Sequence, residues 1–467
     1  MPEKINHIHI MLTICLFLIS GCSSYNSEEI RQKHAENYPL QLAQKTREIL
    51  DGNEPLNLDD CIRISMDNSL AIKENEIKQR LALLEKKVSF ANFLPAVSLN
   101  YDKKWFDPQP MIQFGSTGIP MQDKDVREIT WNIQLSIFNP ATWCMYALHT
   151  HGYEISKLVT EYTRQSIALQ ITAQYFQCLS LEKMLIVTES QLNAAKAVQR
   201  ELKALGVEGI ANDWKVEQAN SLVLTRQTEL QRTKNSHKQA KAELMANMGL
   251  NPLEDVSLET QLNLEVPEGS LEDLITEALL NHPSMSISDR EAAVEKEKIR
   301  AAVTAFIPNL YGYAARIDTS DSHQVFTNYW LGGISAAITL FDGLANVNYY
   351  KAAKELRQAS LLRRDQAAIT LMIQVIRASD QVQTAKDLVE LTEQIEKTSA
   401  IHLAEIKKQY EQGLIQTSDM LMMTAEAQNA EVQSLQARFQ YQTCIAMLNN
   451  VMGHTKTKFE DSNNDTK

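Results

Sequence analysis

Two stretches of the chain, 141–205 and 343–411, contain few residues that break helices, and they constrain the fold more than any other feature. At about 1.5 Å per residue, each would form a helix on the order of 100 Å long. Helices of this length do not fit inside a globular core and occur in coiled coils and helical barrels. The 467 residues include 15 Gly and 12 Pro, too few for an all-β porin with its frequent turns. The sequence therefore predicts a mainly α protein with a small β part.

The two halves of the sequence repeat each other. Three segments of the first half recur in the same order in the second half: 58–95 at 271–308, 129–138 at 332–341, and 248–249 at 452–453. The separations are 213, 203 and 204 residues, so the copies differ mainly in the lengths of their loops. Ordered matches of this kind indicate a tandem duplication, and we expect a duplicated domain that closes around an axis.

Each half is predicted to have the same order of elements: a helix, a β-hairpin, a long helix, a turn and a returning helix. The first helix is expected over 58–93 in one copy and over 271–306 in the other, where Pro283 interrupts it near its start. A proline two residues beyond each of these ends forbids continuation of the helix. The repeats are expected to span 58–262 and 271–453.

The predicted hairpins, 96–139 and 309–341, alternate strictly between apolar and polar residues, and a polar loop joins the strands of each. Alternation places the apolar residues on one face of a strand. These apolar positions are Ile129, Trp131, Ile133, Leu135 and Ile137 in the first copy and Ile334, Ala336, Ile338 and Leu340 in the second.

Four strands cannot close a barrel wide enough for a pore, and an open sheet cannot face lipid. Either the sheet packs on a soluble core or several chains pool their strands. The tryptophans favour the second alternative, because four of the five (Trp105, Trp131, Trp143 and Trp330) lie in or beside the predicted strands. Aromatic residues at strand ends are typical of a membrane interface.

The N-terminus has the features of a bacterial lipoprotein signal. Residues 1–21 contain Lys4 and then an apolar run that is too short to span a bilayer. Two small residues directly precede Cys22, as in a lipobox, so we expect cleavage before Cys22 and its acylation. The residue after Cys22 is Ser23. In lipoproteins of this type, a residue other than Asp at this position favours the outer membrane.

The ends of the mature chain are expected to be loosely structured. Residues 22–57 would form an N-terminal extension that carries the lipid anchor, and 454–467 a flexible tail.

The sequence contains no pattern that indicates catalysis. H-E-x-x-H, G-x-S-x-G, P-loop and G-x-G-x-x-G motifs are all missing, and the ten His are scattered. A net charge of −12 disfavours nucleic acid as a partner. Four cysteines remain beyond the signal and its processing site: Cys61, Cys144, Cys178 and Cys444. Their spacing is not that of metal ligands, and we expect buried free thiols. A disulfide stays possible in an oxidising compartment. We therefore expect no enzyme, no cofactor and no bound metal.

Each long helical stretch ends at a turn that contains glycine, 206–212 in the first half and 413–418 in the second. Asp213 and Asp419 follow near the starts of the returning helices, where the helix dipole favours a carboxylate.

Together these features resemble the TolC-type outer membrane efflux protein family, and its lipoprotein branch in particular. The resemblance covers residues 58–453 and rests on Cys22, on the duplicated plan and on short motifs at matching places. The motifs are Phe93-Leu94-Pro95, Phe306-Ile307-Pro308, Leu340-Phe341-Asp342-Gly343, Tyr410-Glu411-Gln412-Gly413 and Ser418-Asp419-Met420-Leu421.

The resemblance implies a homotrimer in the bacterial outer membrane. Each chain would give four strands to a shared twelve-stranded β-barrel, and its helices to a periplasmic α-helical barrel. It also implies passive conduction, with an inner-membrane pump that supplies the energy and a periplasmic adaptor that joins pump and channel.

The resemblance also implies a gate at the periplasmic mouth, where the family has a tyrosine and aspartates near the second helical turn. Tyr410 and Asp419 match these positions, and Asp213 is the carboxylate at the first turn. A threefold ring of Asp419 would favour cations. Ile415 and Met422 stand where some members carry a gate arginine and a second aspartate, so we expect a different gating network.

The motif Phe341-Asp342-Gly343 is expected to turn the last strand into the following helix, as Phe138-Asn139-Pro140 does in the first half.

The sequence therefore predicts an outer membrane exit duct of a tripartite efflux or secretion system. The alternative is a lipid-anchored periplasmic coiled-coil scaffold or adaptor, in which the hairpins form a soluble sheet. The exported substrate is left open.

Overall fold

The computed structural model describes residues 26–50, 55–260 and 264–454. The predicted signal peptide, the predicted lipidation site Cys22 and the predicted tail beyond His454 lie outside these residues.

The described chain is mainly helical. Its helices are α2 Ser27–Ile49, α3 Leu58–Asn68, α4 Leu70–Ala91, α5 Pro140–Val207, α6 Asp213–Asn247, α7 Leu271–Asn281, α8 Pro283–Thr304, α9 Ala345–Glu411 and α10 Thr417–Val451. Its strands are β1 Ala96–Trp105, β2 Met111–Phe114, β3 Thr117–Pro120, β4 Asp125–Phe138, β5 Asn309–Thr319 and β6 Asn328–Ala337. Among the described helices, none has a segment both long and apolar enough to cross a bilayer.

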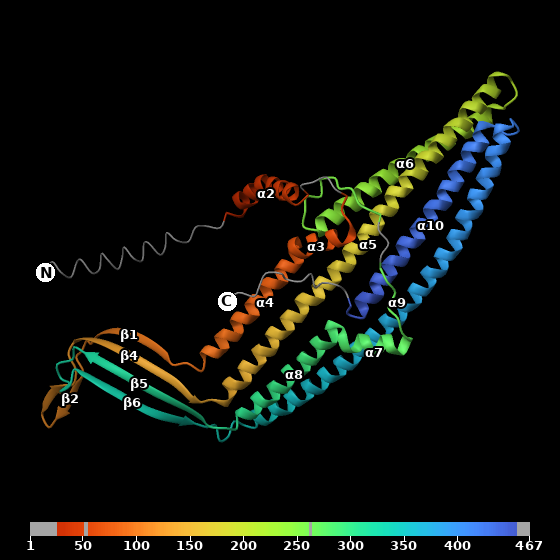
Figure 1. The fold of residues 1–467 in the computed structure, drawn as a ribbon. Helices are drawn as coiled ribbons and strands as arrows, with labels where there is room; N and C mark the ends of the chain where they lie inside the picture. The colour runs from red at the N-terminus through yellow and green to blue at the C-terminus, as the bar shows by residue number, and fades with distance from the viewer. Residues whose placement is uncertain (1–25, 51–54, 261–263, 455–467) are drawn as a thin grey trace.

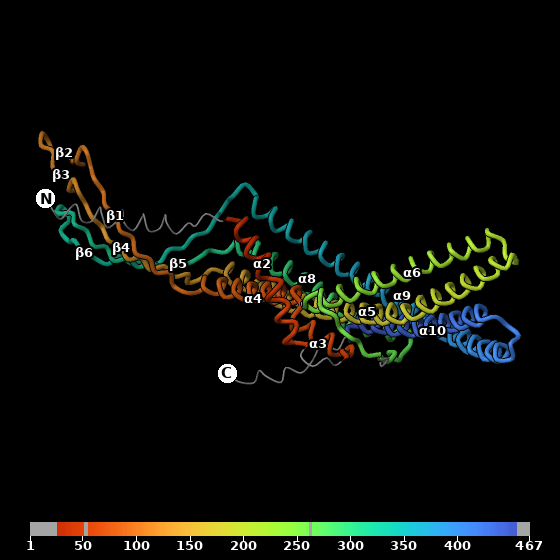
Figure 2. Tube along the Cα trace, turned by 90° about the horizontal axis from the view of Figure 1, so that it is seen from above, coloured from red at the N-terminus to blue at the C-terminus, as the bar shows by residue number. Residues whose placement is uncertain are grey.

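The molecule is elongated, and its elements are sorted along its length (Figure 1). The strands lie at one end, and α5 and α9 run from the sheet to the other end, where the chain turns back as α6 and α10. The shorter helices α4 and α8 pack on the parts of α5 and α9 nearer the sheet. The view turned by 90° shows the same separation of strands from helical turns (Figure 2). Both predicted long helices are confirmed, with 68 residues in α5 and 67 in α9.

Four strands form one antiparallel sheet in the order β1-β4-β5-β6. The central pair, β4 and β5, joins the two halves of the chain. Each outer strand is hydrogen-bonded on one side only within the described residues, so β1 and β6 are edge strands.

Two apolar clusters fill the middle of the molecule. The first is built mainly from the first half of the chain, with Phe439 of α10 added, and the second is built from the second half. The clusters use equivalent positions, because Ile171 and Met248 in the first stand 204 residues before Val375 and Met452 in the second. In the first cluster, the buried Tyr175 also places its hydroxyl against the backbone oxygens of Leu56 and Glu259. This contact ties the segment before α3 and the segment after α6 to the core of the first half, and burial raises the pKa of the Tyr175 phenol.

The helical turns are closed by glycines in the left-handed region, an arrangement that satisfies the last carbonyl groups of a helix. At the end of α9, Gly413 has φ 72°, and its N–H donates to the carbonyl oxygen of Tyr410 at 2.9 Å. The next N–H, of Leu414, donates to Gln409 at 2.9 Å. The ends of α5, α6 and α10 repeat this pattern at Gly209, Gly249 and Gly453.

The prediction of one continuous helix over 58–93 is wrong, because the chain breaks at Ser69 between α3 and α4. The second copy breaks at the equivalent place, His282, where the following proline disfavours helical backbone. No proline follows Ser69. Instead, the end of α6 packs here so closely that a Cβ on Gly249 would overlap the backbone carbonyl of Asn68. A tertiary contact therefore accompanies the break in the first copy.

The prediction that 22–57 is loosely structured is wrong for 27–49, which form α2. Asn26 caps this helix by accepting from the N–H of Glu29 at 3.4 Å. Near its other end, the buried Thr46 accepts from the N–H of Asn251 at 2.8 Å, which anchors the helix to the segment that follows α6.

Two predictions about the hairpins are also wrong. The loop expected between the strands of the first hairpin contains a second small sheet, β2 paired with β3. The last strand ends at Ala337, so Ile338 and Leu340 lie beyond β6 rather than within it. Both side chains are exposed, at 50 % and 89 %, and have no ladder partner to continue the strand within the described chain.

The four described cysteines are free, as expected, and three of them are buried. Burial raises the pKa of the Cys61 thiol and of the Cys178 thiol to about 12. Both thiols belong to the first apolar cluster and behave as small apolar side chains there.

Replacing Gly249 by Ala should lower the free energy of unfolding by about 2–4 kcal/mol, because the left-handed backbone costs about 1–2 kcal/mol and overlap with Asn68 adds to it. The matched control is Gly209→Ala, where no other group lies within 4 Å of the added Cβ, and about 1–2 kcal/mol should be lost. Chemical unfolding of the purified protein measures both. Equal losses would contradict the role given to the contact with Asn68.

Candidate functional site

The two helical turns lie together at the end of the molecule opposite the sheet (Figure 1). In the α9–α10 turn, Tyr410 lies near the end of α9 and Asp419 in the first turn of α10. The Tyr410 hydroxyl lies 3.3 Å from Oγ1 of Thr417, so the side-chain contact across this turn is made with Thr417. Asp419 is exposed beside it.

Asp213 lies at the other turn, as the first residue of α6, and is also exposed. The structure therefore places the three gate candidates at one end of the molecule, with Tyr410 and Asp419 at one turn and Asp213 at the other. Sequence reasoning missed Thr417, although a hydroxyl seven residues after a tyrosine, across a glycine turn, could have indicated the pair.

The helical turns also expose large apolar side chains. Val207 is 91 % exposed, and Ile210 and Leu414 are both 69 % exposed. Apolar residues gathered at the tip of a protein commonly mark a surface that another protein covers.

The segment between β6 and α9 contains the predicted turn residues Phe341, Asp342 and Gly343. A carboxylate oxygen of Asp342 accepts from the N–H of Asn346 at 2.8 Å, which caps the start of α9. Gly343 has φ 68° and Leu344 φ 70°, so the backbone reverses here in the left-handed region. The equivalent place in the first half uses Asn139 before Pro140 at the start of α5.

The register of the sheet gathers the apolar positions of different strands on one face. Directly paired residues of antiparallel strands point to the same side, and Val97 pairs with Ile133 and Leu99 with Trp131. Ile334 of β6 joins this face through Gly312 of β5, which pairs with both Leu135 and Ile334. The opposite face of β1 and β4 is polar, with Ser98 paired to Asn132 and Asn100 to Thr130.

This apolar face is open to its surroundings rather than packed on a core. Val97 is 61 % exposed, Trp131 49 % and Ile334 75 %. Among the residues that the structure describes, nothing covers the apolar face or the two edges of the sheet.

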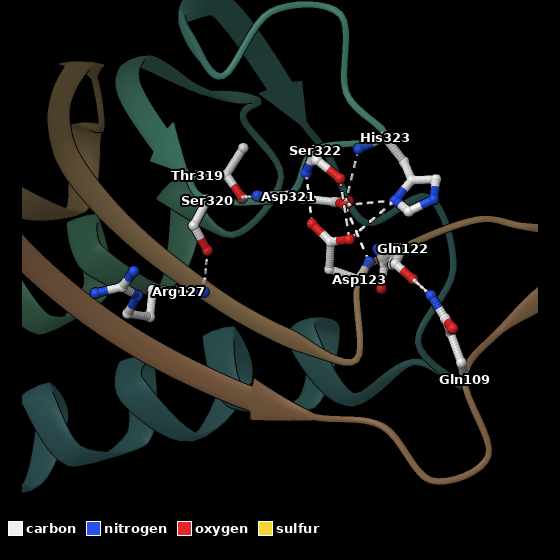
Figure 3. Close-up of polar contacts among 9 residues, drawn as sticks. All are labelled: Gln109, Gln122, Asp123, Arg127, Thr319, Ser320, Asp321, Ser322 and His323. Carbon is white, nitrogen blue, oxygen red and sulfur yellow. Dashed lines mark hydrogen bonds and ion pairs between the residues drawn. The ribbon is translucent and has the colours of Figure 1, made fainter. Parts of the chain in front are cut away.

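Polar loops close the end of the sheet far from the helices. The segment between β3 and β4 contributes Asp123, and the β5–β6 loop contributes Asp321 and His323 (Figure 3). Among the described residues, these three form the group of His, Cys, Asp and Glu side chains whose ligand atoms lie close enough to hold a metal ion. Sequence reasoning missed them because Asp123 lies 198 residues from Asp321, so no local spacing indicates the group.

Residues 274–454 match the family model described as outer membrane efflux protein. Over these residues the chain is similar to outer membrane efflux proteins. The match begins within α7 and extends past α10, and over the second repeat it bears out the resemblance to outer membrane efflux proteins found in the sequence. A comparison with curated protein sequences gave no match.

Solved structures share the fold over most of the chain. CmeC, an outer membrane channel of Campylobacter jejuni, is 15% identical with a TM-score of 0.73 over 87% of each chain. VceC, an outer membrane protein of Vibrio cholerae, is 14% identical with a TM-score of 0.68 over 85% of this chain and 96% of its own. The MtrE outer membrane channel of Neisseria gonorrhoeae is 16% identical with a TM-score of 0.66, over 85% and 88%. The predicted fold class, mainly α with a small β part, is confirmed.

Replacing Asp342 by Ala should cost about 1 kcal/mol, because the first turn of α9 loses its side-chain cap. The control Asp342→Asn keeps an oxygen that can accept from Asn346 and should lose a few tenths of that amount. The shift in thermal unfolding of the detergent-extracted protein measures both. Unchanged unfolding of the alanine variant would contradict the capping role.

Proposed function

We propose that this chain forms the outer membrane exit channel of a tripartite efflux or secretion system. Three copies each contribute four strands to one β-barrel and their long helices to a periplasmic tunnel. The channel conducts passively and catalyses no reaction. A periplasmic adaptor joins it to an inner-membrane pump, which supplies the energy.

The observation that carries this proposal is the open four-stranded sheet. Its edge strands β1 and β6 lack a second neighbour within the described chain, and unpaired strand edges cannot face the interior of a bilayer. Pairing β6 of one copy with β1 of the next satisfies both edges and closes a ring. The face that carries Trp131 and Ile334 then meets lipid, and the polar face of β1 and β4 lines water.

The helices support the same assembly. Ile369, Ile373 and Ile376 of α9 are spaced three or four residues apart and are all partly exposed, at 51 %, 42 % and 37 %. This spacing places them on one side of the helix. Within its own chain α9 packs on α7, α8 and α10, so this apolar stripe is available to a helix of a neighbouring copy.

The turns supply the surface for the adaptor and the gate. Val207, Ile210 and Leu414 offer exposed apolar contacts at the periplasmic end. Tyr410, Asp213 and Asp419 are the gate residues of the proposed channel. The bond of Tyr410 to Thr417 stiffens the turn, and Asp419 brings a ring of negative charge to the mouth.

The same proposal includes export, cleavage of residues 1–21 and acylation of Cys22, with the lipid anchor in the outer membrane and most of the chain in the periplasm. It is supported by the lipobox-like sequence and by the efflux protein domain.

Replacing Ile133 by Lys should abolish assembly of the trimer in the outer membrane, because a charge on the lipid-facing side of a strand is costly, about 2–4 kcal/mol per copy at the bilayer midplane. Light scattering of the detergent-extracted protein, with single-particle imaging, measures mass and shape. The wild type should be a trimeric tube with a detergent belt at one end.

The control is Gln134→Lys, at the neighbouring position on the opposite face, which should still assemble. A monomeric wild type without a detergent belt, or equal assembly of both variants, would overturn the barrel and favour the scaffold alternative. Ile338 is unsuitable for this test because it lies beyond β6.

Replacing Asp419 by Asn should reduce the preference of the channel for cations, since three carboxylates leave the mouth. The reversal potential across a planar bilayer with a salt gradient measures this preference and should move toward zero. Glu254→Gln removes the same charge far from the turn and should leave the potential unchanged. Equal effects of the two variants would refute a gate role for Asp419.

A further inference from the structure

The two loops at the tip of the sheet meet through charged side chains that come from different halves of the chain. Asp123 precedes β4, while Asp321 and His323 lie in the β5–β6 loop (Figure 3). The cluster lies beyond the ends of the strands, at the opposite end of the molecule from the helical turns that carry the gate candidates.

The spacing of the side chains suits a tetrahedral metal ion. Nδ1 of His323 lies 3.3 Å from an oxygen of Asp123 and 3.4 Å from an oxygen of Asp321. The ligand atoms of all three residues lie within 4.8 Å of one another. Two bonds of about 2.1 Å at a tetrahedral zinc ion separate their ligand atoms by about 3.4 Å. The two distances from the His323 nitrogen to the carboxylate oxygens therefore already match the separation of zinc ligand atoms.

The burial of Asp321 supplies an independent reason to expect a cation. Its side chain is 1 % exposed, and its Oδ2 atom has no hydrogen-bond partner. Its Oδ1 atom accepts from the backbone N–H groups of Asp123 at 3.1 Å and His323 at 3.2 Å. A buried carboxylate with an oxygen left unsatisfied is costly. Within the described residues, the ion-pair partner of both Asp123 and Asp321 is His323.

Hydrogen bonds from the backbone and from Ser322 fix the position of the cluster without an ion. Asp123 accepts from the backbone N–H of Ser322 at 2.6 Å and from its hydroxyl at 3.0 Å. These bonds hold the pKa of the Asp123 carboxyl below its usual range, so the group is ionised at neutral pH. The base of the loop is fixed as well, because the N–H of Arg127 donates to Oγ of Ser320 at 2.9 Å. Such supporting bonds orient ligands around a metal.

We propose that Asp123, Asp321 and His323 bind one divalent transition-metal ion, with zinc as the best fit, and that the ion fastens the two loops at the tip of the sheet. One imidazole nitrogen and two carboxylate oxygens suit zinc, whereas calcium requires six to eight oxygen ligands. Asp123 and His323 are 31 % and 30 % exposed, so solvent reaches the site and water can complete the coordination. The proposal stands independently of the channel function.

The test uses the full-length, detergent-extracted protein without a polyhistidine tag, stripped with a chelator and titrated with zinc by calorimetry. We expect one zinc ion per chain, and at least a tenfold loss of affinity in both His323→Ala and Asp321→Asn. Asp321→Asn keeps the oxygen that accepts the two backbone N–H groups, so its loop should stay folded. The controls Asp102→Asn and His402→Ala, which remove the same groups elsewhere, should bind zinc like the wild type.

Cobalt gives a second reading that is independent of affinity. Co²⁺ in the wild type should show the intense visible absorption of a tetrahedral site, and His323→Ala should lose it. Absence of stoichiometric binding in the wild type, or binding that survives in both site variants, would overturn the proposal.

Discussion

The unpaired edges of a four-stranded sheet are the constraint on which the rest of this architecture depends. Backbone N–H and C=O groups along β1 and β6 need partners, and the exposed apolar face beside them needs a covering that one chain does not provide. One end of each strand of this sheet connects to a helix, so whatever closes the sheet also arranges the helices. The proposed ring of copies would meet all of these needs at once, because the exposed stripe of α9 would then face a neighbouring copy.

Duplication explains how one chain makes two nearly equivalent halves of this arrangement. The end of α6 packs on the break between α3 and α4, and the end of α10 packs on the break between α7 and α8 through Gly453 and Asn281. The copies differ where strand becomes helix. Pro140 starts α5 directly after the strand in the first half, whereas the second half ends β6 early and caps α9 with Asp342. Equivalent packing thus tolerates different local chemistry at the junctions.

The two ends of the molecule are closed by different kinds of interaction. At the helical turns, glycine caps and the contact of Tyr410 with Thr417 hold each hairpin within its own half of the chain. At the tip of the sheet, Asp123 and the loop around Asp321 join the two halves through hydrogen bonds. A metal ion there would strengthen a junction that already exists between the repeats.

The sequence by itself determined the long helices, the strands of the sheet except the end of the last one, and the resemblance to outer membrane efflux proteins, because helix breakers, apolar periodicity and repeated motifs are local patterns. It could not place the break at Ser69, since no local residue forces it and the packing of Gly249 against Asn68 accompanies it. It could not reveal the group formed by Asp123 and His323, because only the pairing of β4 with β5 brings those loops together. Local patterns therefore decided the elements, and contacts between residues about 200 positions apart decided the junctions and the candidate metal site.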